Sequence, residues 1–180
     1  KLSVDESEND TLLAERSAFA CGYLNEPKKR CSCSSYQVQR YLSKISGPLL
    51  DRIDLHIELS PVPFSELSNK IAQECSRTIR KRVNATREIQ NNRFKSKKKN
   101  RSNSNMTKSE LNKYCLLTND SSELIELAMN KLNLSARAYD RILKVARTIA
   151  DMDYKSNIEQ SHIAEAIQYR ALDKLNHYLD

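Results

Sequence analysis

The chain has 180 residues and a formal net charge of +7, with 39% hydrophobic residues but no Trp and only three Phe. Two Gly and four Pro are too few for the turns of a β-sandwich or barrel, so the composition favours packed helices. No apolar run approaches the roughly 18 residues that cross a bilayer, and the start lacks a signal peptide's apolar core. We therefore expect a cytoplasmic protein without a membrane partner. Its clustered positive charge fits either a polyanionic partner or a solvated basic helix face.

The first part of the chain combines an acidic start with a Cys-containing loop. Residues 1–10 are polar and match no known pattern, and Lys stands first, so we expect a trimmed chain or a piece of a longer one. A short apolar run over 12–14 leads into CGYLNEPKKRCSCSS at 21–35. Five Cys in a cytosolic chain indicate buried thiols or metal ligands rather than a disulfide framework. We expect Cys75 and Cys115 to be small core residues on apolar stripes.

Three elements are predicted between the loop and the middle of the chain. Helical spacing of apolar residues over 34–45, ended by Gly47-Pro48, predicts a short helix. In RIDLHIEL, residues 52–59, apolar and polar residues alternate, which is typical of a half-buried strand. The segment from 64 to 94 is an Arg- and Lys-rich helix with one narrow apolar stripe, formed by Ile71, Cys75, Ile79 and Val83.

The second half of the chain is set apart by a basic stretch. Residues 95–105 contain no apolar residue, which predicts an exposed basic linker, so we place a boundary at 95–106. Four segments of helical spacing with short breaks then predict a compact four-helix bundle over 107–177. The expected fold is mainly α: an α/β remnant with one clear strand over 11–94, then a helical domain over 107–180.

Several long segments resemble one protein family. SKISGPLLDRIDLHIEL, at 43–59, resembles the motif before a core strand in magnesium-chelatase-like AAA+ ATPases. LNLSARAYDRILKVARTIADMD and IEQSHIAEAIQYRALDK resemble the C-terminal lid of that family, and CGYLNEPKKRCSCSSYQVQRY and TIRKRVNATREIQNNRF are similar to its intervening segments. The resemblance covers residues 11–175 and favours the competence-associated, ComM/YifB-type branch. It implies an AAA+ core remnant followed by a helical lid.

The resemblance implies a hexameric ATPase that acts on DNA, as a helicase or branch-migration motor in DNA uptake and recombination. The sequence has no GxxxxGK[ST] loop and no hydrophobic run ending in Asp-Glu. We therefore expect ATP and Mg²⁺ to bind only in a complete assembly, either a homo-hexamer or a complex with an N-terminal AAA+ partner chain. Alone, the chain should be inactive, and a broken or truncated gene product would show this pattern.

Two other functions remain open at this stage. A magnesium-chelatase ATPase subunit uses the same AAA+ parts to insert Mg²⁺ into a porphyrin. The Cys-rich insertion and the amino-acid sequence of the lid nevertheless favour the competence branch. A non-catalytic DNA-binding or interaction module would need no nucleotide at all.

Two candidate nucleotide residues lie before the basic helix. The family's arginine that projects into a neighbouring subunit's nucleotide site corresponds to Arg52, and a guanidinium suits that task because it forks its donors towards phosphate oxygens. The alternative is a local ion pair with Asp51 or Asp54. Ser17 follows the family's core strand, which two charged residues interrupt here, and it is the candidate polar sensor of the γ-phosphate.

The third candidate nucleotide residue is Arg137. It falls in the first turn of a predicted helix with Ser135 as its N-cap, where the helix dipole disfavours a cation by roughly 0.3 to 1 kcal/mol. A compensating anion is therefore expected, and helix N-termini bind phosphate. The resemblance implies that Arg137 is the sensor-2 arginine. The alternative is a side chain that simply extends into water.

A metal site is implied by the resemblance of the thiols Cys21, Cys31 and Cys33 to a family pattern of two C-x-C pairs. Four such thiolates would bind Zn²⁺ tetrahedrally. Phe19 stands where the first Cys of the pattern should be, so only three ligands remain. We expect free thiols, with zinc bound substoichiometrically at most.

The basic stretch holds ten Lys and Arg between positions 77 and 99, enough to release many counterions from a nucleic-acid backbone. Few aromatic residues are interleaved with them, so the pattern favours phosphate contacts without sequence preference over base stacking. The alternative is a solvated helix and loop. The candidate DNA-binding residues are Arg77, Arg80, Arg82, Arg87, Lys97, Lys98 and Lys99.

Overall fold

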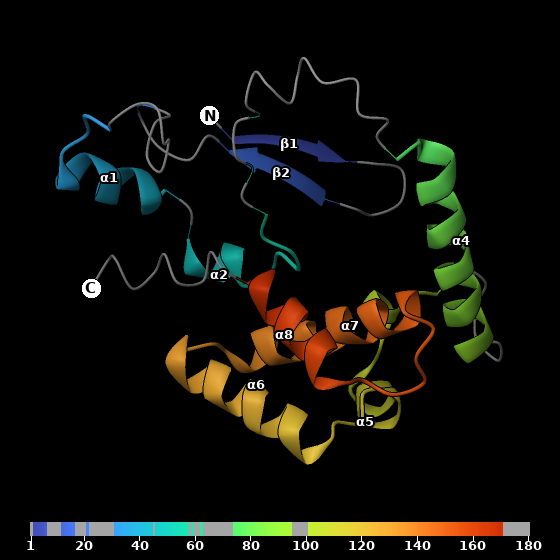
Figure 1. The fold of residues 1–180 in the computed structure, drawn as a ribbon. Coiled ribbons are helices and arrows are strands. Elements are labelled where there is room, and N and C mark those ends of the chain that lie inside the picture. The colour runs from blue at the N-terminus through green and yellow to red at the C-terminus, as the bar shows by residue number, and fades with distance from the viewer. Residues whose placement is uncertain are drawn as a thin grey trace.

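The computed structural model describes residues 2–6, 12–16, 21, 31–44, 46–57, 59, 62, 74–94 and 101–170. Within these ranges the fold is mainly helical, which confirms the fold class predicted from the sequence (Figure 1). No helix in these ranges is both long and apolar enough to span a bilayer. Ser17, Phe19 and Lys97 to Lys99 lie outside the described residues, so their expected roles stay predictions.

A two-stranded antiparallel sheet begins the chain. β1 (Leu2–Glu6) pairs with β2 (Leu12–Arg16), and the register places Val4 opposite Ala14. Residues 1–10 were assigned only as an unmatched polar start, and the structure places β1 within this segment. Apolar and polar residues alternate in LSVDE, but the acidic composition around it obscured this short period-2 signal.

Two short helices follow the Cys loop. α1 (Ser35–Leu42) begins with a capping box, in which the Ser34 hydroxyl accepts from the Gln37 amide N–H and the Gln37 side chain accepts from the Ser34 N–H. It is the predicted helix, but it ends at Leu42. Gly47-Pro48 opens the next helix, α2 (Gly47–Leu50), because proline is tolerated in the first turn, where its missing N–H has no helical partner.

The strand predicted for residues 52–59 does not form among the described residues of that segment. The end of α8 (Gln160–Gln168) engages its backbone instead: the His56 N–H donates to the Tyr169 carbonyl at 2.7 Å, and Arg170 donates to the Ile53 carbonyl. The apolar residues at 55, 57 and 59 stay 45%, 63% and 82% exposed. The prediction was wrong because alternation makes a strand only where a neighbouring strand pairs with it.

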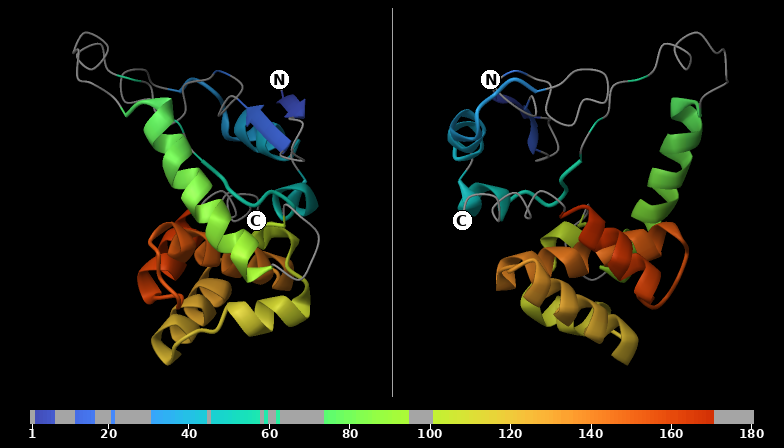
Figure 2. Two further views of the ribbon diagram at one scale, coloured as in Figure 1. Left: turned by 90° about the vertical axis from the view of Figure 1, so that its right-hand side faces the viewer. Right: turned by 60° about the vertical axis from the view of Figure 1, so that its left-hand side comes forward.

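The basic helix α4 (Ser76–Arg93) is partly detached from the rest of the fold. Its C-terminal end packs on the helical domain that follows residue 106, which we call the lid, and its N-terminal end extends beyond this domain (Figures 1 and 2). The buried side chains are Thr86 and Gln90, whereas Ile79 and Val83 of the predicted apolar stripe are 43% and 47% exposed. Cys75 is also exposed, at the N-cap position, so its prediction as a core residue was wrong.

The four-helix bundle predicted for 107–177 is confirmed within the described residues. It consists of α5 (Lys108–Tyr114), α6 (Asn119–Lys131), α7 (Ala136–Met152) and α8. Thr107, Thr118 and Ser135 cap the first three helices with their hydroxyls, each accepting from an amide in the first turn. α7 is the central helix and contacts α4, α5 and α8. Cys115 is buried in the bundle, as predicted.

The core of this lid gathers along one side of α7. Ile142, Ala146 and Ala150 of α7 are completely buried there, and Ile158 and Ile163 belong to the same hydrophobic core. Their spacing along α7 is the i, i+4 pattern of a single helix face. The lid therefore owes its stability to a continuous aliphatic core.

The predicted linker contributes to this lid. A single 3-10 turn, η1 (Asn103–Asn105), packs on α7, with Asn103 1% exposed and the following Met106 5% exposed. The expectation of a wholly exposed linker over 95–106 is therefore wrong for part of 101–106, and residues 95–100 lie outside the described residues. The Asn103 amide, which donates to Thr148 and Asp151, and the Met106 side chain in the hydrophobic core hold this turn in place.

Candidate functional site

Asp51 lies where the PLLDRID segment meets the N-terminus of α7. The Ser135 hydroxyl donates to the Asp51 carboxylate at 2.8 Å, although the two residues are 84 positions apart. The same carboxylate lies 4.0 Å from the Arg137 guanidinium and 3.7 Å from that of Arg170. A single aspartate thus connects the loop after α2, the first turn of α7 and the end of α8.

The first turn of α7 has the cap that the sequence predicted. The Ser135 hydroxyl accepts from the Ala138 N–H at 3.1 Å while donating to Asp51. An anion was expected to offset the unfavourable position of Arg137, and Asp51 is such an anion within the chain. The Arg137 side chain is nevertheless 55% exposed, and its contact with Asp51 is long. It neither points only into water nor forms a tight pair.

A second ion pair joins the same two segments. Arg141, one helical turn after Arg137, pairs with Asp54, one turn after Asp51. Burial lowers the pKa of Arg141, and the nearby Arg170 and Arg52 lower it further while Asp51 opposes them. Cations therefore crowd at this place. They keep their charge, because an arginine does not lose its proton at physiological pH.

Arg52 is exposed at the edge of this group, and its guanidinium donates to the Pro48 carbonyl at 3.3 Å. A local ion pair with Asp51 or Asp54 was the alternative interpretation of this residue. Within the described ranges no such pair is formed, because Arg137, Arg141 and Arg170 contact those two carboxylates. We call the whole group the arginine cluster: Arg52, Arg137, Arg141 and Arg170 with Asp51 and Asp54.

The arginine cluster has four cations and two anions, an excess of two positive charges. Two of its members, Arg52 and Arg137, were predicted from the sequence, and the structure brings their segments together. Arg141 and Arg170 were assigned no role from the sequence. Arg141 could have been found, because it lies four residues after Arg137 on the same helix face. The position of Arg170 depends on the tertiary fold alone.

The three thiols predicted as metal ligands lie together. The sulfur atoms of Cys21, Cys31 and Cys33 are all within 4.8 Å of one another, and those of Cys21 and Cys31 are 3.4 Å apart. Hydrogen bonding to Cys21, with some desolvation, raises the pKa of Cys33 to about 11. Among the described residues no fourth His, Cys, Asp or Glu joins them. The donor set suits a soft or borderline cation but supplies three of four tetrahedral positions.

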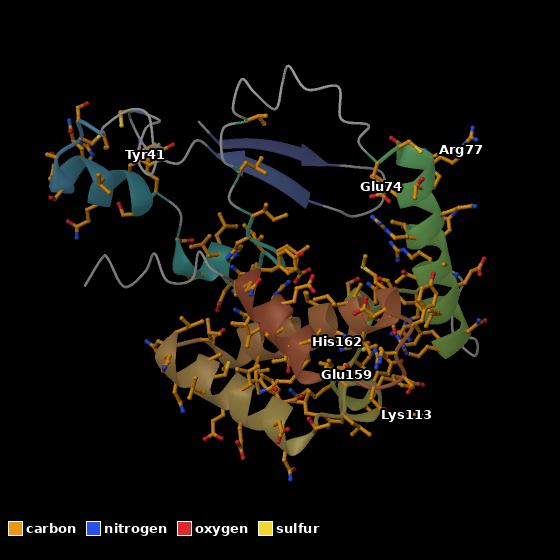
Figure 3. All side chains as sticks on the ribbon, viewed as in Figure 1. Tyr41, Glu74, Arg77, Lys113, Glu159 and His162 are labelled. Carbon is orange, nitrogen blue, oxygen red and sulfur yellow. The ribbon has the colours of Figure 1, made fainter. Side chains whose placement is uncertain are left out.

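The described candidates for DNA binding divide into two groups. Arg77, Arg80 and Arg87 are exposed on α4, and Figure 3 shows Arg77 at the end of the helix far from the lid. Arg82 is different, because both its terminal nitrogens donate to the Glu74 carboxylate, at 2.8 and 3.1 Å. The structure therefore offers three of these four arginines to a partner and pairs the fourth within the chain.

A buried network holds α4 on the lid. Arg93 of α4 donates twice to the Asp151 carboxylate of α7, at 2.6 and 2.5 Å, and that side chain is completely buried. Arg147 and Asn103 donate to the same carboxylate at 3.1 and 2.8 Å. Burial lowers the pKa of Arg147, and Asp151 opposes this shift. The basic helix is thus fixed to the helix that carries Arg137 at its other end.

Fold and site together define a helical lid with an arginine cluster at one end, joined to a basic helix at the other. Comparison with protein families agrees: the family described as "Magnesium chelatase, subunit ChlI C-terminal" matches residues 73–170, and "Magnesium chelatase, subunit ChlI" matches residues 7–67. The chain belongs to this magnesium-chelatase ChlI family.

Curated relatives place it more narrowly beside ComM/YifB-type members. It is 43% identical over 143 residues to "Competence protein ComM" of Haemophilus influenzae. It is 42% and 40% identical over 144 residues to "Uncharacterized protein YifB" of Salmonella typhimurium and of Escherichia coli. Each match covers 79% of this chain but only 27% or 28% of the relative. The chain thus spans about a quarter of the length of these relatives.

Proposed function

We propose that the chain is the part of an ATP-driven AAA+ ring acting on DNA that responds to nucleotide at a subunit boundary. The observation that carries the proposal is the shared carboxylate of Asp51. It follows α2 directly before Arg52 and lies 4.0 Å from Arg137, so both candidate arginines belong to one cluster. Similarity to a protein named for competence supports the choice of DNA as the substrate.

The arginine cluster is suited to a polyphosphate. Its excess of positive charge favours an anion, and guanidinium groups match phosphate oxygens with paired donors. Arg137 can turn from Asp51 to a phosphate without breaking a close ion pair, since that contact is 4.0 Å long. Asp51 keeps its contacts with Ser135 and Arg170 meanwhile, which holds the loop in place.

Both arginines would act on one nucleotide. Arg52 follows Asp51 in the chain and Arg137 lies 4.0 Å from the Asp51 carboxylate, so the two arginines start from neighbouring backbone positions. They would therefore face one subunit boundary, in a homo-hexamer or with an N-terminal AAA+ partner chain. The complete assembly would supply the groups that bind ATP and Mg²⁺, since this chain carries no phosphate loop.

Binding of inorganic tripolyphosphate, followed by titration calorimetry, tests the cluster without any other chain. We expect Arg52→Gln and Arg137→Gln each to weaken binding about tenfold, because a charged hydrogen bond contributes about 1.5 to 3 kcal/mol. Arg82→Gln is the matched control, since Glu74 already pairs with that arginine. Equal affinity in all three variants would refute the nucleotide role. The unmodified chain alone should hydrolyse no ATP above a buffer blank.

A magnesium-chelatase ATPase subunit is the second candidate, favoured by the family's own description. It needs the same arginine cluster but no DNA. Duplex DNA binding by the chain would favour the first function, and its absence with intact tripolyphosphate binding would favour the second. A plain DNA-binding module would show the reverse pattern, with DNA bound and tripolyphosphate ignored.

The thiols would form an incomplete zinc site within this function. Three thiolates leave one position of the metal to water, which lowers the affinity for zinc. Cys33 must also lose its proton to bind the metal, and its raised pKa opposes this loss. We expect less than one zinc per chain by elemental analysis, rising with pH. Phe19→Cys should raise the occupancy if the resemblance aligns that position correctly. One tightly held zinc in the unchanged chain would mean that another residue completes the site.

A further inference from the structure

We propose that α4 binds duplex DNA with one face, lying in the major groove, while its other side stays fixed to the lid. The face consists of Arg77, Arg80, Asn84, Arg87 and Asn91. The inference rests on the DNA-binding part of the proposed function and assigns it a form of DNA, an element and a groove. It also separates these residues from Arg82, which the sequence pattern grouped with them.

The five residues share a face by helical geometry. Each residue of an α-helix turns the chain by roughly 100°, so positions 77, 80, 84, 87 and 91 fall within an arc of roughly 80°. All five are exposed. Arg82 falls on the opposite side, roughly 180° from the middle of this arc, where Glu74 pairs with it.

The opposite side of α4 is already used. Thr86 and Gln90 are buried towards the lid, and Arg93 holds the C-terminal end through its two bonds to Asp151. The N-terminal half extends past the lid in both views of Figure 2. The helix is therefore held at one end and presents its polar face along its length, which is how a rigid helix can enter a groove.

The chemistry of the face complements duplex DNA. Arg77, Arg80, Arg87 and the flanking Lys81 carry four positive charges against one from Glu88, which leaves an excess of three for phosphates. The amide of Asn84 lies between Arg80 and Arg87 along the face, and that of Asn91 lies one turn beyond Arg87. Both arginine and asparagine side chains hydrogen-bond to base edges of the major groove. That groove is about 12 Å wide and admits an α-helix, and α4 is about 27 Å long.

Single-stranded DNA is a poorer fit to the same face. Proteins that bind single strands stack bases on aromatic side chains, and the sequence of α4 from Ser76 to Arg93 contains no aromatic residue. The arginines alone give a phosphate-binding ridge without a stacking platform. A duplex needs no platform, because its bases remain stacked.

The experiment measures binding of a fluorescent duplex at several salt concentrations. The double variant Arg80→Gln/Arg87→Gln should bind at least tenfold more weakly, and its slope of log affinity against log salt should be smaller by up to about 1.8, since each lost duplex phosphate contact removes about 0.9. Arg82→Gln removes one arginine from the opposite side of the helix as a control, and it should leave affinity and slope unchanged. Thermal melts of all three chains should coincide, because the substituted side chains are exposed.

Two modified probes test the groove and the form of DNA. A duplex with glucosylated hydroxymethylcytosine, which fills the major groove, should bind more weakly, whereas netropsin in the minor groove should have little effect. The inference fails if the double variant behaves like Arg82→Gln, if netropsin alone blocks binding, or if a single strand of the same sequence binds more tightly. In each of these cases DNA binding itself would stand. If the unchanged chain bound no DNA, the DNA part of the proposed function would fail instead.

Discussion

The lid and the segment after α2 differ in how far their apolar side chains are exposed. In the lid, Ile142, Ala146 and Ala150 have no exposed surface, and α7 is covered by its neighbours. In the segment after α2, Leu55, Ile57 and Leu59 alternate just as regularly along the chain but are 45% to 82% exposed. Both patterns are typical of residues that become buried. Within the described residues, only the apolar residues of the lid are buried by their neighbours.

The difference shows which elements can fold on local and short-range contacts. Helices satisfy their own backbone, so four of them with short connections bury their faces on each other. A strand needs a neighbour for both its backbone and its side chains. The alternating segment therefore depends on a partner strand to become part of a sheet, whereas the described helices of the lid bury their apolar faces against one another.

The largest effect is expected from Asp151→Ala, which removes the buried carboxylate that Arg93 and Arg147 share. Both guanidinium groups would be left without their partner, and breaking such a buried pair costs about 3 to 5 kcal/mol. We expect a fall of that size in the free energy of unfolding, measured by urea titration of the far-UV circular dichroism. Lys155→Gln, which breaks an ion pair with both side chains about half exposed, should change it by less than about 1 kcal/mol.

The comparison itself can be broken by truncating one residue from each region. Ile142→Ala should lower the free energy of unfolding by about 2 to 5 kcal/mol, because the side chain is fully buried and leaves a cavity. Leu59→Ala, at 82% exposure, should change it by less than about 0.5 kcal/mol. A loss above 1 kcal/mol for Leu59→Ala would mean that the segment is covered after all, and the contrast between the two regions would disappear.

The same contrast explains which parts of the fold could be predicted. The lid was predicted in number and order of helices because apolar spacing and short breaks indicated the same structure, and Ser135 was recognised as the cap of α7. The strand over 52–59 was wrong because its pattern does not reveal whether a neighbour is present. The stripe of α4 was wrong for a similar reason, since its pattern does not reveal that Ile79 and Val83 stay 43% and 47% exposed.

The candidate site was predictable only in part. Arg52 and Arg137 were found through their motifs, and the three thiols through their resemblance to a family pattern, yet nothing in the sequence indicated that Asp51 would lie beside Ser135 and Arg137. The contact between Asp51 and Ser135 spans 84 positions and depends on how the loop after α2 packs on α7. Likewise the pairing of Arg82 with Glu74 cannot be read from the charge run, because it depends on where α4 begins.

The smallest of these effects concerns the junction between the two regions, where the Ser135 hydroxyl has two tasks. It accepts from the Ala138 N–H as a helix cap and donates to Asp51 of the loop. Ser135→Ala should lower the free energy of unfolding by about 1 kcal/mol through loss of the cap. Thr118→Ala removes an equivalent cap from α6 without touching the loop after α2, so it should cost about as much. The two variants should differ in amide hydrogen exchange: residues 51–54 should exchange faster in Ser135→Ala and unchanged in Thr118→Ala. Equal exchange in both would show that Asp51 does not need Ser135 to hold the loop, and that the remaining contacts with Arg170 and Arg141 suffice.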